Sequence, residues 1–91
     1  MKLDNLKRIR KKHGITGKVL AEAINVSHPQ IYNYENGVYE PSIDTLILIA
    51  KFFNCSVDYL LGLTDIENPA EYYRDNALDM IKKSISNLEP K

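Results

Sequence analysis

Residues 17–36 have the sequence GKVLAEAINVSHPQIYNYEN, which predicts two short helices joined by a tight turn. The apolar residues on either side of the turn are spaced to face inward; they are Leu20, Ala21, Ile24, Ile31 and Tyr34. At the turn itself, Asn25 tolerates a positive φ and Val26 fills the angle. Ser27 then offers its hydroxyl oxygen to the free amides of the second helix, where Pro29 needs no hydrogen-bond partner. The second helix is therefore expected to begin directly after Ser27.

The same turn pattern occurs twice more, at Gly14-Ile15-Thr16 and at Asn54-Cys55-Ser56. Each time, a residue that tolerates the left-handed conformation is followed by an apolar residue and by a hydroxyl that can cap the next helix. Asn36-Gly37 ends another helix, and Ser42 caps the one after it. These turns and caps predict helices over residues 4–13, 17–24, 28–35, 43–53 and 57–61. No segment predicts a strand, so we expect a compact all-α domain of five helices.

The helix of residues 43–53 is apolar at most of its positions. Its largely buried side is expected to consist of Ile43, Leu46, Ile47, Ile49, Ala50 and Phe53. The short run Ile47-Leu48-Ile49 favours a strand in isolation. It lies, however, within a segment that has helical spacing and a capping residue, so we expect a helix there.

The third helix leaves a polar face turned away from the core, and this face is rich in hydrogen-bonding groups. It consists of His28, Pro29, Gln30, Tyr32 and Asn33. His28 and Tyr32 are also ordinary surface residues at such positions, and without a matching Cys/His set His28 predicts no metal site. Ser27 and His28 are adjacent, so the hydroxyl cannot take the oriented position on the ring that a catalytic triad requires. No other catalytic constellation is present, and we expect neither enzyme activity nor a cofactor.

From Leu6 to Gly62 the chain resembles the Cro/cI-type (XRE-like) family of helix-turn-helix DNA-binding domains, which have the lambda-repressor-like fold. Many positions agree in order and spacing: Leu6, Arg10, Ile15, Thr16, Leu20 to Ala23, Val26, Ser27, Ile31, Tyr34 to Gly37, Pro41, Ser42, Thr45, Leu46, Ala50, Lys51, Val57, Leu60 and Leu61. The resemblance implies that the third helix enters the major groove of double-stranded DNA. His28, Pro29, Gln30, Tyr32 and Asn33 would then read bases, with Gln30 able to bond N6 and N7 of adenine.

The same resemblance implies a set of contacts to the DNA phosphates, made by Arg10, Gly17, Lys18, Asn36, Tyr39 and Ser42. Gly17 departs from the family pattern, which has a phosphate-holding glutamine there, so this contact is missing or is made by Lys18. Asn25 is a second departure, because the family usually has glycine at this position. Asparagine can replace that glycine because it tolerates a positive φ. Tyr34 is assigned to the core and Glu35 to a structural ion pair with Arg10.

The charge distribution is compatible with DNA binding, although the formal net charge is zero. Basic residues crowd the first eighteen positions against a single acidic residue, Asp4; they are Lys2, Lys7, Arg8, Arg10, Lys11, Lys12 and Lys18. The segment after Gly62 is net acidic. A phosphate backbone responds to the local field rather than to the total charge. Several of these side chains are equally explained as the solvated face of the first helix.

Length and composition predict one small intracellular module. The chain has 91 residues, 44% of them apolar, and a single cysteine. Cys55 cannot form an internal disulfide, and we interpret it as a core residue in a reducing cytoplasm. No apolar signal segment and no membrane-spanning run is present, so we expect a cytoplasmic protein without membrane contact.

Three regions are expected: a DNA-binding domain over residues 1–62, a linker over 63–69 and a C-terminal helix within 70–91. The last of these carries a stripe of apolar residues spaced by three, four and three: Leu78, Ile81, Ile85 and Leu88. The stripe either folds back on the chain's own core or pairs with a second copy. Two heptads are short for a coiled coil, and we favour dimerisation.

These features predict a transcriptional regulator, a repressor that binds an inverted-repeat operator as a homodimer. The alternative is a module for binding a protein partner, either antitoxin-like or directed at another regulator, in which the C-terminal helix carries the main function.

Overall fold

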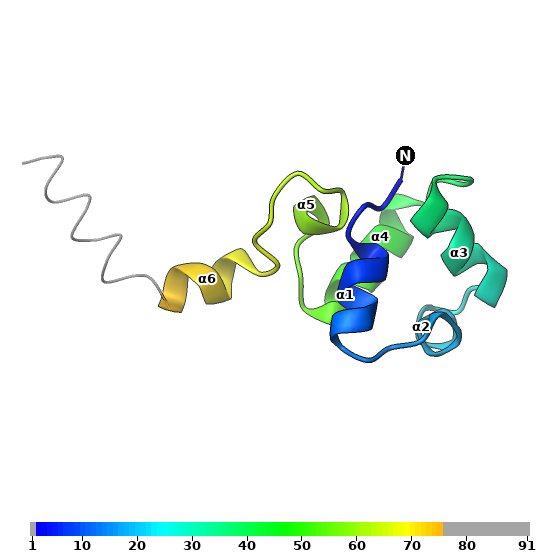
Figure 1. Ribbon diagram of the computed structural model, residues 1–91, viewed down its shortest axis with the longest axis horizontal. Coiled ribbons are helices and arrows are strands. Elements are labelled where there is room, and N and C mark those ends of the chain that lie inside the picture. Colours follow the sequence, from blue (N-terminus) through cyan, green and yellow to red (C-terminus); the bar gives the residue numbers. More distant parts are fainter. Residues whose placement is uncertain (1, 76–91) are drawn as a thin grey trace, which may run out of the picture.

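The computed structural model describes residues 2–75 and, within them, contains helices and no strands. The helices are α1 (Leu6–Lys12), α2 (Gly17–Ile24), α3 (His28–Asn36), α4 (Ile43–Phe53), α5 (Val57–Leu60) and α6 (Pro69–Asp75). The first five form a compact bundle, from which α6 extends away (Figure 1). The predicted five-helix domain followed by a further helix is therefore confirmed. The apolar stripe from Leu78 to Leu88 lies outside the described residues.

The core is continuous across all five helices of the bundle. It is formed by Leu3, Leu6, Ile9, Leu20, Ala21, Ile24, Ile31, Tyr34, Leu46, Ile49, Ala50, Phe53, Tyr59 and Leu60. Ile15, Val26 and Cys55, the apolar residues of the three turns, pack against it and are partly buried. The turns therefore close the bundle as well as redirect the chain.

The left-handed turn residues have the predicted conformation. φ is 68° at Gly14, 58° at Asn25 and 52° at Asn54. Thr16 and Ser56 also cap as expected, since their side chains accept hydrogen bonds from Val19 N and Tyr59 N.

The predicted capping by Ser27 is wrong. Ser27 has the extended backbone of a capping residue, but its side chain makes no capping hydrogen bond. The amides that it would serve are missing or already used. Pro29 has no N–H, and the Gln30 N–H donates to the Ser27 carbonyl at 3.1 Å.

The first helix begins at Leu6, later than expected, because residues 3–5 bond to other helices instead of winding into α1. Leu3 N donates to Tyr34 O at 3.3 Å, and Asn5 Nδ2 donates to Tyr59 O at 2.7 Å. This short segment therefore ties the end of α3 to α5.

The predicted buried side of α4 is partly wrong. Leu46, Ile49, Ala50 and Phe53 are buried, but Ile43 is 75% exposed and Ile47 is 41% exposed. The buried residues form one narrow stripe at helical spacing. Ile43 and Ile47 lie outside this stripe and are exposed, as are Leu48 and Phe52.

The segment between α5 and α6 is tied to the bundle by hydrogen bonds. Ser56 N donates to Glu67 O at 2.8 Å, and Asn68 Nδ2 donates to Asn54 O at the same distance. Lys12 Nζ lies 2.5 Å from Glu67 Oε1. The linker expected from composition thus contacts both the end of α1 and the turn between α4 and α5.

Candidate nucleic-acid interface

The α2–α3 pair forms a helix-turn-helix whose geometry is set by its turn. Val26 N donates to Ala21 O at 2.9 Å, which closes the chain over the end of α2. Leu20 and Ile31 are fully buried between the helices, and Tyr34 is buried near the end of α3. The inner face of α3 is therefore fixed against the core, and this determines which residues face outward.

The outward face of α3 is the one that the sequence predicts. His28, Pro29 and Tyr32 are exposed, while Gln30 and Asn33 are half-buried. All five lie on one helix of nine residues, which is long enough to present its first two turns to a groove. Their contacts with bases remain a prediction.

Two of these polar side chains are joined in a hydrogen-bonded chain along α3. Asn33 Nδ2 donates to Gln30 Oε1, and Gln30 Nε2 donates to the Tyr34 hydroxyl, both at 3.3 Å. The amide of Gln30 is therefore oriented from both ends by its own helix. Sequence reasoning missed this chain, although spacings of three and four residues on a helix are its signal.

Gly17 lies against His28 at the point where α2 and α3 begin. A Cβ at position 17 would lie 3.0 Å from His28 Nε2 and 3.2 Å from His28 Cδ2. The glycine therefore leaves room for the imidazole. A larger residue here, such as the glutamine of the family pattern, would have to displace that ring.

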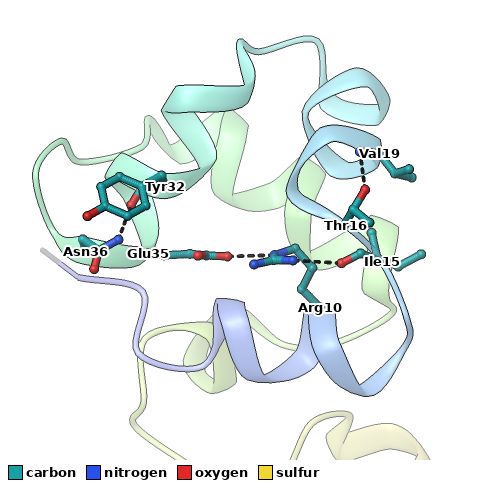
Figure 2. A network of polar contacts seen from close by, with 7 residues as sticks. All are labelled: Arg10, Ile15, Thr16, Val19, Tyr32, Glu35 and Asn36. Carbon is teal, nitrogen blue, oxygen red and sulfur yellow. Dashed lines mark hydrogen bonds and ion pairs between the residues drawn. The ribbon is translucent and has the colours of Figure 1, made fainter.

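The predicted phosphate contacts at the rim of α3 differ in how free their side chains are. Lys18 and Tyr39 are exposed. Asn36 is exposed too, but its Nδ2 donates to Tyr32 O at 2.8 Å, so its side-chain nitrogen is already used within α3 (Figure 2). The Ser42 hydroxyl accepts from Thr45 N at 3.1 Å as the cap of α4.

Arg10 is held by partners inside the protein, and its predicted contact with a DNA phosphate stays a prediction. Its Nε lies 2.8 Å from Glu35 Oε1, and its Nη1 donates to Ile15 O at 3.1 Å (Figure 2). The side chains of Arg10 and Glu35 are only 15% and 8% exposed. The guanidinium is thus used inside the protein, where it joins α1, the first turn and α3. The predicted ion pair with Glu35 is confirmed.

Two findings in residues 2–75 concern metal binding and thiol reactivity. This part of the chain contains no group of three or more His, Cys, Asp or Glu residues that could hold a metal ion. Burial and the charge of Glu67 raise the pKa of the Cys55 thiol to about 11, so the reactive thiolate is disfavoured. In the same residues, no helix has the length and apolar character needed to span a bilayer.

Comparison with known proteins identifies the family. The helix-turn-helix family model matches residues 6–60. The P22 c2 repressor, solved in complex with a synthetic operator, is 31% identical with a TM-score of 0.61, over 67% of this chain and 94% of that one. The chain therefore belongs to the helix-turn-helix family of the Cro/cI type.

Two curated relatives are similar along most of this chain. The HTH-type transcriptional regulator ImmR of Bacillus subtilis is 35% identical over 89% of this chain and 59% of its own length. The antitoxin PezA of Streptococcus pneumoniae is 29% identical over 92% of this chain and 54% of its own length. The chain thus spans little more than half the length of these two relatives.

Proposed function

We propose that this chain is a sequence-specific, double-stranded DNA-binding transcriptional regulator that acts as a repressor in the cytoplasm. The outward polar face of α3, held by a buried inner face, is the observation that carries this proposal. Similarity to a regulator and to an operator-bound repressor supports it.

In this proposal α3 lies in the major groove and its first two turns contact base edges. Gln30 and Asn33 offer amide groups, which suit adenine, and a good bidentate contact discriminates between bases by about 1–3 kcal/mol. His28 and Tyr32 flank them. Lys18, Asn36 and Tyr39, with the Gly17 amide and Ser42, hold phosphates and set the register of the helix on the duplex.

One helix of this size reads only a few base pairs, so we propose that two copies bind together. Two symmetric copies require an inverted repeat with half-sites about one helical turn apart. The C-terminal stripe of Leu78, Ile81, Ile85 and Leu88 is one candidate for holding the copies together.

The test is enrichment from a random duplex DNA pool by the purified full chain at near-physiological salt. An enriched inverted repeat is the expected result, with Gln30→Ala changing the preferred base at one position per half-site. Lys18→Ala should instead weaken all sequences and reduce the salt dependence by roughly one unit of slope. Retention that vanishes with salt and shows no enriched sequence would contradict the proposal.

A second candidate is binding to a protein partner, as in an antitoxin. It is supported by the similarity to PezA along most of this chain. It is the weaker of the two, because it leaves the oriented polar face of α3 without a role. Failure of the enrichment experiment, with capture of one defined partner that needs residues 70–91, would favour it.

A further inference from the structure

The outer face of α4 is an apolar surface that the bundle leaves uncovered. Ile43 is 75% exposed, Leu48 47%, and both Ile47 and Phe52 41%. Asp44 and Lys51 are exposed on the same face. We call these six residues the α4 outer face. Large exposed apolar side chains gathered on one short helix commonly mark an interaction site.

The α4 outer face is complementary to itself. The pattern of apolar and charged positions along the face is the same in both directions. Ile43 at its start corresponds to Phe52 at its end, and both are apolar. The same relation joins Ile47 with Leu48 and, with opposite charges, Asp44 with Lys51. A second α4 that runs antiparallel across a two-fold axis would therefore place like with like at the apolar positions and acid against base at the charged ones.

We infer that the occupant of the α4 outer face is a second copy of this chain, packed with the two α4 helices antiparallel. At the two-fold axis, Ile47 then packs against the partner's Ile47, and Leu48 against the partner's Leu48. Asp44 pairs with the partner's Lys51 on each side of the axis. Within residues 2–75, neither Asp44 nor Lys51 has an ion-pair partner of its own, so both charges are available.

The contact is expected to be weak. Six side chains on one helix of eleven residues cover less than the roughly 800 Å² per partner of a standard interface. We expect a dissociation constant in the micromolar range or above, because so few side chains leave little binding free energy once the entropic cost of association is subtracted. None of the six residues belongs to the proposed base-reading or phosphate-contacting sets, so the contact leaves α3 free. The contact also requires no DNA, so an experiment can disprove it without disproving the proposed function.

The positions of Asp44 and Lys51 also have a simpler explanation within one chain. The experiment must distinguish this explanation from the contact between two chains. Asp44 lies in the first turn of α4 and Lys51 in the last turn, where each favours the helix dipole. This effect acts within one chain, and reversing both charges adds the two losses in stability. In the antiparallel pair, reversing both charges restores complementarity. Within one chain the two residues are about 10 Å apart along the helix and do not pair.

The experiment measures self-association of the full chain by sedimentation equilibrium at about 150 mM salt, where long-range attraction is screened. Asp44→Lys and Lys51→Asp should each raise the dimer dissociation constant by on the order of tenfold, since each puts like charges opposite one another. The double variant should return close to the wild-type value. The two single variants, mixed together, should form a heterodimer, because all the charges of one then face opposite charges on the other.

The control is an equal mixture of Asp58→Lys and Lys7→Asp, which carries the same charge changes on exposed residues elsewhere and should show no such gain. Circular dichroism confirms that every variant folds. A wild-type chain that stays monomeric up to millimolar concentration would overturn the inference. So would association that is unchanged by both single variants but lost in Ile81→Glu, since this would assign the contact to the C-terminal stripe.

Discussion

Arg10 Nε donates to Glu35 Oε1 at 2.8 Å, and this bond joins α1 to the last turn of α3. Both side chains are largely buried, and Arg10 also holds the carbonyl of Ile15. Glu35 is the only acidic partner of Arg10 among residues 2–75, so this ion pair helps to fix the orientation of α3 relative to α1.

Glu35→Ala is expected to lower the free energy of unfolding by about 3 kcal/mol or more, because it leaves the Arg10 guanidinium buried without its counter-charge. Lys12→Ala is the matched control. It breaks an ion pair with Glu67 that is exposed to solvent, and its effect should be much smaller. Urea denaturation measures both. If the two variants lose equal stability, the Arg10–Glu35 pair has no special structural role. Arg10→Met/Glu35→Leu should recover most of the loss, since it removes both charges together.

Tyr34→Phe is expected to change base preference without contacting DNA. The Tyr34 hydroxyl accepts from Gln30 Nε2, so its removal frees one end of the Gln30 amide. Discrimination at the base pair that Gln30 reads should change by about 1 kcal/mol, with a stability loss of similar size. Binding-site enrichment with both chains measures the preference. Tyr59→Phe also removes the hydroxyl of a buried tyrosine, but Tyr59 lies in α5 and the enriched sequence should be unchanged. An identical motif from the wild type and from Tyr34→Phe would show that the bond has no role in recognition.

The turns and caps could be predicted from the sequence because their chemistry is local. Asn25 and Asn54 adopt the left-handed conformation that their residue type allows, and Thr16 caps the helix that follows it. Ser27 was mispredicted because the outcome depends on which amides remain free, and Pro29 removes one of them.

The faces of α4 and the contacts between distant segments could not be predicted in the same way. A helix that is apolar almost all round gives no periodic signal for which side is buried, and Ile43 and Ile47 were placed on the wrong side. The bond from Leu3 to Tyr34 joins residues far apart in the chain, and no sequence pattern marks it. The ion pair of Arg10 with Glu35 is confirmed, whereas its contact with a phosphate stays a prediction.

Gly17→Ala is expected to alter DNA recognition while leaving stability unchanged or slightly higher. Alanine favours the helix by up to about 1 kcal/mol, and the atoms it would meet belong to the movable ring of His28. The displaced imidazole should then lose whatever base contact it makes. The measurement is the enriched sequence of Gly17→Ala compared with that of His28→Ala. The double variant should match His28→Ala alone, and an added loss in the double variant would show that Gly17 contributes to binding by another route.

Stability is expected to fall as the pH rises above about 9, and Cys55 should account for part of the fall. Burial raises the pKa of its thiol from an ordinary value of 9.0 to about 11 in the folded state. Between these two values the unfolded chain loses the thiol proton and the folded chain keeps it, so deprotonation favours unfolding. Burial also raises the pKa of Tyr59, and the bond with Glu67 raises the pKa of Lys12. Both shifts act in the same direction, because each makes the folded chain hold its proton to higher pH.

The contribution of the thiol is isolated by comparing the wild type with Cys55→Ala in urea denaturation at several values between pH 8 and 11. The informative quantity is the slope of stability with pH, since the substitution also removes packing at every pH. The slope should be shallower in Cys55→Ala above pH 9, and the two slopes should agree below it. Rapid alkylation of Cys55 in the folded chain at pH 8 would contradict the raised pKa directly, because the thiolate is the reactive form.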